Sequence, residues 1–221
     1  MYLEEAAWLR RELGRLEVAD GDAVLNVASS TEHYRTVEQP HNETEVLGPL
    51  RARGAEIVNL DLTAAPGVDV VCDLLAPDLD LRRELGRAFS IVLATGLLEH
   101  LPESEVPRIL ERLQAVVGPE GHLVLTTPFK YRRTKDPVDY GYRPSPESLL
   151  ELLLRDRRFA PVKAELVRID APQYYKGFIS RASVVPVGGR WVPLPGGSEQ
   201  LRRLIKAWRW QETCVIAAAT R

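Results

Sequence analysis

Short apolar runs alternate with segments of helical spacing along most of the chain. Five apolar runs have the length expected of buried strands, namely 23–28, 56–61, 69–73, 89–95 and 122–127. Segments with helical spacing flank or separate these runs, at 2–15, 43–53, 78–87, 103–117 and 146–154. This alternation predicts an α/β fold with a doubly wound, mostly parallel sheet.

The C-terminal part of the chain has a different character. Residues 162–169 alternate like a strand, 198–210 have helical spacing, and 213–220 form a final apolar run. The intervening segment 171–197 is rich in proline and glycine and carries several aromatic residues. We expect this segment to be an irregular connection or lid between the last two strands.

Composition and charge narrow the classes of partner. The 221 residues are 45% hydrophobic and 27% charged, with a formal net charge of −2, which is unlike a nucleic-acid-binding surface. The apolar runs are far shorter than the roughly 20 residues of a membrane span, and the charged segment after Met1 is unlike a secretory signal. Cys72 and Cys214 lie in apolar runs and are expected to be buried hydrophobes rather than metal ligands.

These properties predict one cytoplasmic domain, residues 1–221, that acts on a small molecule and has no metal, nucleic-acid or membrane partner. They indicate no oligomeric state.

Small and polar residues follow the first three strands, where a parallel sheet binds its ligands. The run 26–30 would let a ligand approach the backbone closely, and its hydroxyls can hydrogen-bond a carboxylate or phosphate. Asp61 can accept hydrogen bonds from ribose hydroxyls, while Asp73 and Leu74 can bind and cover a purine. Each signal alone also fits a packing loop, a solvated acid or a helix cap, and their order along the chain favours a ligand site.

Polar side chains also follow the fourth and fifth strands. Thr95 and Gly96 end the fourth strand, and Glu99 and His100 come directly afterwards. A histidine can accept a proton near neutral pH, although one at a helix start is often structural. The loop 130–143 interleaves aromatic and charged residues and suits an acceptor substrate, the alternative being a surface loop of solvated charges.

Several of these segments resemble the class I S-adenosylmethionine-dependent methyltransferases, particularly the small bacterial ones. The run Leu98–Pro102, which reads Leu-Glu-His-Leu-Pro, is similar to their fourth motif. Residues 117–125 resemble the segment leading into their fifth strand, with Glu120 in place of one glycine, and 136–146 resemble the segment after it. The resemblance covers about residues 20–160 by motif and implies a seven-stranded sheet whose last strand is antiparallel.

The resemblance implies a methyltransferase that uses S-adenosylmethionine to modify an oxygen or nitrogen atom of a small-molecule acceptor. Carried over by position, it assigns nine residues to the methionine end, ribose, adenine and sulfonium of the cofactor: Asn26, Ala28, Ser29, Ser30, Asp61, Asp73, Leu74, Thr95 and Gly96. We expect His100, and after it Glu99, to act as general base. We expect Tyr140, Tyr142 and Arg143 to shape the acceptor pocket.

The first motif departs from the pattern of these enzymes, which is an acid followed by glycines, as in Asp-x-Gly-x-Gly-x-Gly. This chain has Asn26-Val-Ala-Ser-Ser30, which lacks the acid's negative charge and carries Cβ atoms that restrict the backbone. The alternative is therefore a catalytically inactive methyltransferase-like protein that serves as a binding or scaffold partner. A nicotinamide-dependent oxidoreductase is disfavoured, because Gly-x-Gly-x-x-Gly is missing and Asp61 lies 35 residues beyond Asn26 instead of about 20.

Overall fold

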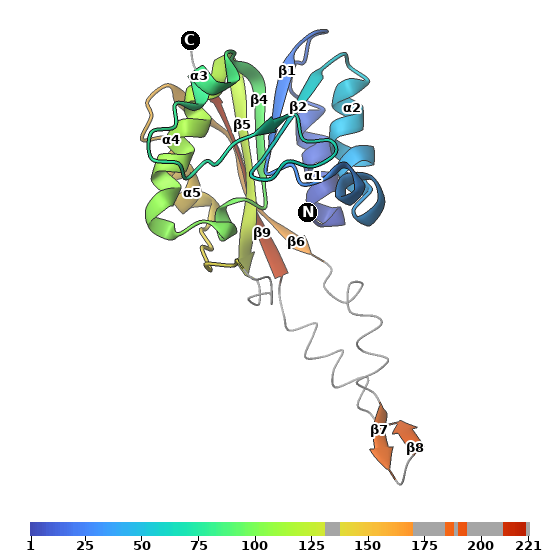
Figure 1. Ribbon diagram of the computed structural model, residues 1–221. Coiled ribbons are helices and arrows are strands. Elements are labelled where there is room, and N and C mark those ends of the chain that lie inside the picture. The colour runs from blue at the N-terminus through green and yellow to red at the C-terminus, as the bar shows by residue number, and fades with distance from the viewer. Residues whose placement is uncertain (131–137, 170–183, 188–189, 194–209, 220–221) are drawn as a thin grey trace.

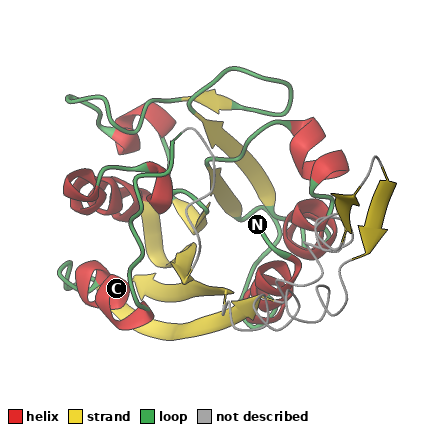
Figure 2. Cartoon of the chain, turned by 90° about the horizontal axis from the view of Figure 1, so that it is seen from below, coloured by secondary structure: helices red, strands yellow, loops and turns green. Residues whose placement is uncertain are grey.

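The computed structural model describes residues 1–130, 138–169, 184–187, 190–193 and 210–219. Seven strands form one sheet in the order β3-β2-β1-β4-β5-β9-β6, with helices on both faces (Figures 1 and 2). These strands are β1 (Ala23–Val27), β2 (Glu56–Asp61), β3 (Val70–Val71), β4 (Phe89–Thr95), β5 (Val117–Lys130), β6 (Phe159–Ile169) and β9 (Trp210–Ala219).

The sheet has the predicted direction of strands. The pairs β1–β2, β2–β3, β1–β4 and β4–β5 are parallel, and β9 runs antiparallel to both of its neighbours, β5 and β6. The prediction of a doubly wound, mostly parallel sheet with an antiparallel last strand is therefore confirmed.

The helical elements lie in two groups. One face of the sheet carries α1 (Leu3–Leu13), the π-helical η2 (Asn42–Leu47) and α2 (Gly48–Arg51), and the other carries α3 (Leu81–Leu85), α4 (Val106–Val116) and α5 (Pro146–Leu153). Three short elements lie in loops: η1 (Tyr34–Glu38), η3 (Leu98–His100) and η4 (Glu103–Glu105).

Two apolar cores hold these layers together. Successive residues of a strand point to opposite faces, so Leu25 and Val92 join the core beneath α3, α4 and α5, whereas Val24 and Ile91 join the core beneath α1, η2 and α2. Both faces of the central strands are buried, which explains why these strands are continuous apolar runs in the sequence.

Helix ends follow local capping chemistry. The Asp80 carboxylate accepts a hydrogen bond of 3.1 Å from the Arg83 backbone N–H, and Gly86, with φ of 64°, ends α3 in the left-handed conformation. These caps limit α3 to Leu81–Leu85 within the predicted range 78–87. Ser145 accepts from the Ser148 N–H at 3.2 Å and caps the start of α5.

Several helices and strands have boundaries that differ from the predicted ones. The third strand contracts to Val70–Val71, and the helix expected over 43–53 is divided between η2 and α2. The strand predicted over 122–127 begins earlier, at Val117, and β5 is irregular at Glu120, which has a φ of 59°, where the pairing with β4 changes register.

The C-terminal region agrees in part with the elements predicted from the sequence. Trp210 begins β9, so the helix predicted to end there is wrong at that residue, and residues 198–209 lie outside the described part. Within the predicted connection 171–197, β7 (Val184–Val187) and β8 (Arg190–Pro193) form a separate antiparallel pair, and the other residues lie outside the described part.

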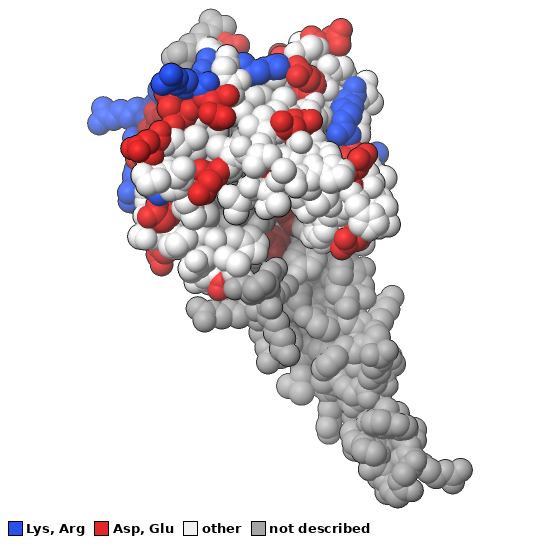
Figure 3. Space-filling model, in the orientation of Figure 1, with Lys and Arg blue, Asp and Glu red and all other residues white. Residues whose placement is uncertain are grey.

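Both cysteines of the chain, Cys72 and Cys214, are buried and free, as expected. Acidic and basic side chains are mixed on the face of the molecule drawn in Figure 3. In the described part of the chain, no helix combines the length and the apolar character needed to cross a membrane.

Replacing Leu113 by alanine should lower the free energy of unfolding by about 2–5 kcal/mol, because this fully buried side chain of α4 would leave a cavity against the sheet. Denaturant titration measures the change. Glu111→Ala on the exposed face of α4 is the matched control and should change stability by less than about 0.5 kcal/mol. Equal effects of the two variants would contradict this packing.

Candidate functional site

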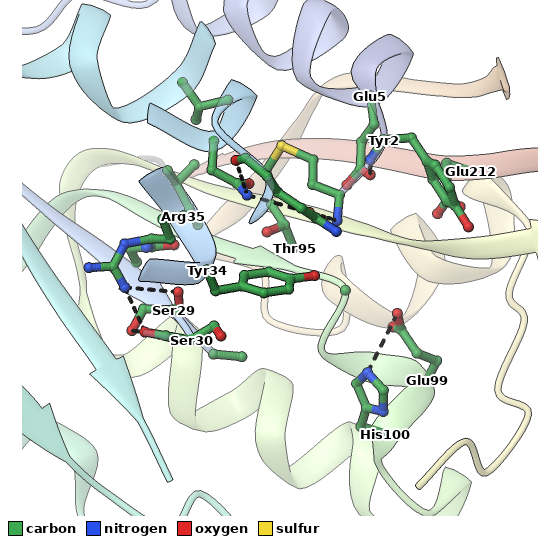
Figure 4. Close-up of a pocket in the computed structure, with 18 of the residues that line it drawn as sticks. Tyr2, Glu5, Ser29, Ser30, Tyr34, Arg35, Thr95, Glu99, His100 and Glu212 are labelled. Carbon is green, nitrogen blue, oxygen red and sulfur yellow. Dashed lines mark hydrogen bonds and ion pairs between the residues drawn. The ribbon is translucent and has the colours of Figure 1, made fainter. Parts of the chain in front are cut away.

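A pocket of about 440 Å³ opens at the carboxyl ends of β1 and β4, the edge at which open α/β sheets bind ligands (Figure 4). The strand exits supply one part of its wall: Asn26, Ala28, Ser29, Ser30, Thr95, Gly96, Glu99 and His100. Residues from α1, η1, the start of β9 and the 138–143 loop complete it, among them Tyr2, Glu5, Tyr34, Arg35, Asp139, Arg143 and Glu212. Figure 4 shows the Tyr34 ring extending between the two sides of the pocket.

The loop after β1 contains two residues in the left-handed conformation typical of glycine, although it has no glycine. Ala28 and Ser30 have φ angles of 54° and 58°, in the left-handed region that side chains other than glycine rarely occupy. The Ser30 N–H donates to the Asp61 carboxylate at 2.8 Å, and the Ser29 N–H donates to the Leu60 carbonyl at 3.1 Å. The end of β2 therefore holds this loop in place.

Arg35 holds the same loop from its other side. Its guanidinium donates to the carbonyl oxygens of Ser29, Ser30 and Gly67 at 3.0, 2.6 and 2.8 Å. The residue is only 4% exposed, and its Nε lies 3.7 Å from a carboxylate oxygen of Glu43. One buried cation thus connects the loops that follow β1 and β2.

The exit of β4 positions the predicted base. The Gly96 N–H donates to the Thr126 carbonyl at 3.0 Å, and its φ of 63° turns the chain into η3. His100 Nδ1 lies 2.6 Å from the Val138 carbonyl oxygen, which can only accept, so Nδ1 carries the proton. In the neutral ring the lone pair is consequently on Nε2, which lies 4.0 Å from Glu99 Oε1.

Buried carboxylates form the wall opposite the β1 loop. Burial raises the pKa of Glu99, with a further contribution from the charge of Glu5. Burial, followed by the charges of Glu5 and Glu99, raises the pKa of Glu212 well above the ordinary glutamate value. The pocket therefore contains acidic groups that can hold protons at a higher pH than exposed carboxylates do.

Most of the predicted cofactor residues come together at this edge of the sheet. Asn26, Ala28, Ser29, Ser30, Thr95 and Gly96 line the pocket, together with both predicted bases. Asp61, Asp73 and Leu74 follow their strands as expected but do not belong to its lining. Asp73 accepts from the Leu75 N–H at 2.8 Å, and Leu74 is buried in the core.

Of the three residues predicted to shape the acceptor pocket, only Arg143 lines the pocket. It pairs with Asp139 at 2.7 Å. Tyr140 is 56% exposed, and Tyr142 packs against the core with a pKa that burial raises; neither side chain belongs to the pocket lining.

Sequence reasoning missed Glu5, Arg35 and Glu212. Glu5 occupies the buried face of α1 beside Ala6 and Leu9, so an acid at an apolar helical position was the available signal. Glu212 stands one residue before the apolar run predicted as the last strand. Because β9 is antiparallel, its first residues lie at the carboxyl edge of the parallel strands.

Comparison with known proteins places the fold. No family model and no curated protein matches the sequence. The 1,6-didemethyltoxoflavin-N1-methyltransferase of Burkholderia thailandensis, solved with S-adenosylhomocysteine, is 17% identical at a TM-score of 0.52, over 98% of this chain and 76% of that one. The geranyl diphosphate C-methyltransferase of Streptomyces coelicolor A3(2) is 12% identical at a TM-score of 0.56, over 98% of this chain and 78% of that one.

This chain has the fold of the S-adenosylmethionine-dependent methyltransferases. The resemblance seen in the sequence is thus confirmed at the level of the fold. The cyclase SpnF matches equally well, with 16% identity, a TM-score of 0.57, and coverage of 98% of this chain and 80% of its own. The fold alone therefore does not assign the chemistry.

Substituting Ser30 tests the conformation of the loop. Ser30→Val should lower the free energy of unfolding by about 1–3 kcal/mol, because a β-branched residue is poorly tolerated at positive φ. Ser30→Gly should leave it within about 1 kcal/mol of the wild-type value, because glycine adopts this φ freely but adds entropy to the unfolded chain. Thermal or denaturant unfolding measures both; equal stability of the valine and glycine variants would contradict the left-handed backbone.

Proposed function

We propose that the chain is an S-adenosylmethionine-dependent methyltransferase that acts on an oxygen or nitrogen atom of a small-molecule acceptor. The observation that carries this proposal is the pocket: within a methyltransferase fold, it brings the loop 28–30 together with Glu99 and His100. Its volume of about 440 Å³ lies in the range of small-molecule sites. The cytoplasmic location stays a prediction.

The loop after β1 fits the methionine end of this cofactor. The left-handed conformations of Ala28 and Ser30 are those typical of glycine, and the side chains facing the pocket there are small. We assign Asn26, Ala28, Ser29 and Ser30 to the methionine end. We assign Thr95 and Gly96, at the neighbouring exit of β4, to the region of the sulfonium.

The adenosine end is assigned to Asp61, Asp73 and Leu74. The Asp61 oxygens accept one hydrogen bond each, from the N–H groups of Ser30 (2.8 Å) and Thr63 (3.3 Å). A carboxylate offers about four lone-pair sites, so Asp61 keeps capacity for the hydroxyls of a ribose.

When bound, the cofactor would supply a methyl group on a sulfonium, which the acceptor atom would take in exchange for a proton, the electron pair of the broken carbon–sulfur bond remaining with the cofactor product. The protein has to position the acceptor and receive that proton. His100 suits the second task because Val138 holds its Nδ1–H, which leaves the lone pair of Nε2 available. Glu99, at 4.0 Å, can stabilise the imidazolium that forms.

A methyltransferase-like protein without catalytic activity is the second candidate. It is favoured by the first motif, where Asn26 stands in place of an acid and its amide donates to the buried Asn59 side chain at 3.0 Å. Such a protein would serve as a binding or scaffold partner.

Calorimetry with S-adenosylhomocysteine separates the two candidates. The wild-type chain should bind in the micromolar range, and Ala28→Leu, which puts a larger side chain into the pocket, should weaken binding by about tenfold or more. Ala64→Leu in the exposed loop after β2 is the control and should bind like wild type. Absence of wild-type binding would contradict the proposal and favour the scaffold, and preference for a dinucleotide would contradict both.

His100→Ala tests the general base once an acceptor has been found by release of S-adenosylhomocysteine. The variant should bind the cofactor product normally and turn over about 10²- to 10⁴-fold more slowly, the usual contribution of a positioned base. The loss should be smaller for acceptors that are already deprotonated. Unchanged turnover would rule out the role of base.

A further inference from the structure

Three carboxylic side chains come together on the side of the pocket away from the cofactor loop. Glu5 comes from α1, Glu99 from η3 and Glu212 from the first residues of β9, and all three line the cavity. Figure 4 shows Glu5 and Glu212 on the side opposite Ser29 and Ser30. This side adjoins the exits of β4 and β5 and lies near Arg143, one of the residues predicted to shape the acceptor pocket.

The three acids differ in the hydrogen bonds that their carboxyl oxygens accept. Glu5 accepts hydrogen bonds from the Thr126 hydroxyl and from the Tyr2 N–H, the latter at 2.9 Å. Glu99 Oε2 accepts from the Thr127 hydroxyl at 3.2 Å. Glu212 is only 3% exposed, and its Oε1 has no hydrogen-bond partner within the part of the chain that the structure describes. A buried carboxyl oxygen without a donor is costly, so its place in a cavity wall points to a ligand that donates.

Among the described residues, the positive groups near the pocket are bonded to other partners. Arg143 donates to Asp139 at 2.7 Å, the Met1 ammonium donates to Gln39 at 3.1 Å, and Arg35 is held by backbone carbonyls. The Met1 and Arg143 charges lower the pKa of Glu212, but burial and the two acids outweigh them and raise it. The described lining of the cavity therefore keeps an excess of acidic groups.

We propose that Glu212, together with Glu99, binds the ammonium group of the acceptor, which makes the acceptor an amine. An alkylammonium carries up to three N–H donors and one positive charge, which match an unpartnered carboxyl oxygen and a neighbouring carboxylate. Among the described residues, no group of three or more His, Cys, Asp or Glu side chains is arranged to hold a metal ion. That the amine is the methyl acceptor rests on the proposed function, whereas the ammonium site stands on the pocket itself.

The same acids can prepare the amine for reaction. An ammonium has no lone pair, so its proton must move first; transfer to a carboxylate of Glu99 or Glu212 gives a neutral amine and a carboxylic acid, with no change in total charge. The carboxylic acid afterwards returns the proton to solvent. Burial of both acids brings their proton affinity closer to that of an amine.

Matched pairs of amines and alcohols test the site directly. We suggest phenethylamine with 2-phenylethanol, and tyramine with tyrosol, titrated by ligand-observed NMR with and without S-adenosylhomocysteine. The wild-type chain should bind the amine of a pair about tenfold more tightly or better. Glu212→Gln should bring each pair to within about threefold, while Glu151→Gln, which removes an exposed acid of α5, should keep the preference.

The stability of the ligand-free variant separates a binding role from a structural one. Glu212→Gln should raise the melting temperature by about 2–4 °C, because it removes a buried acid that lacks a donor. Since the folded pKa of Glu212 is raised, its ionisation destabilises the fold increasingly as pH rises from the ordinary glutamate range through that pKa. The gain should therefore be larger at about pH 8 than at about pH 5.

Several results would overturn the ammonium site. These are alcohols that bind as tightly as amines, no binding by any amine of the set, a preference that survives Glu212→Gln, a lowered melting temperature in that variant, or saturable Mg²⁺ binding that the variant abolishes. Loss of S-adenosylhomocysteine binding with an intact amine preference would instead overturn the proposed methyltransferase and leave the site standing.

Discussion

The buried guanidinium of Arg35 fixes the loop on which one wall of the pocket is built. Two residues of that loop, Ala28 and Ser30, have left-handed backbones, and such conformations cost about 1–3 kcal/mol each and persist only where the surroundings enforce them. Arg35 supplies that enforcement through charge-assisted hydrogen bonds to three carbonyls. The bond from the Ser30 N–H to Asp61 then couples the loop to the end of β2. A glycine-free loop can thereby hold two residues in the conformation typical of glycine.

The opposite wall depends on the topology of the sheet. Because β9 enters antiparallel between β5 and β6, its first residues come to the edge where the parallel strands end. Glu212 thus meets Glu99 from η3 and Glu5 from α1 in a cavity that shields them from water. The pocket combines a wall of small side chains with a wall of acids. This asymmetry would let one side accept a cofactor while the other selects a cation.

The sheet could be predicted well because the spacing and the length of the apolar runs distinguish strands from helices. Buried apolar runs and amphipathic helices specify the layers, and the residues after each run, including Asn26, Thr95 and His100, come together at one edge. Non-local features could not be predicted. The burial of Arg35 among carbonyls depends on how two loops meet. Tertiary packing decides that Arg143 lines the pocket whereas Tyr142 packs against the core. Trp210 was assigned to a helix because local spacing does not reveal pairing with β6.

A crystal structure with S-adenosylhomocysteine bound tests the central claim, that the edge formed by β1, β2 and β4 is a cofactor site. We predict that the amino-acid end lies against Asn26–Ser30 beside Thr95 and Gly96, that the ribose hydroxyls contact Asp61, and that Arg35 keeps its carbonyl bonds. The thioether sulfur should face the side occupied by Glu99 and His100. Binding elsewhere on the chain, or a bound state in which the loop after β1 abandons its left-handed residues, would contradict the claim.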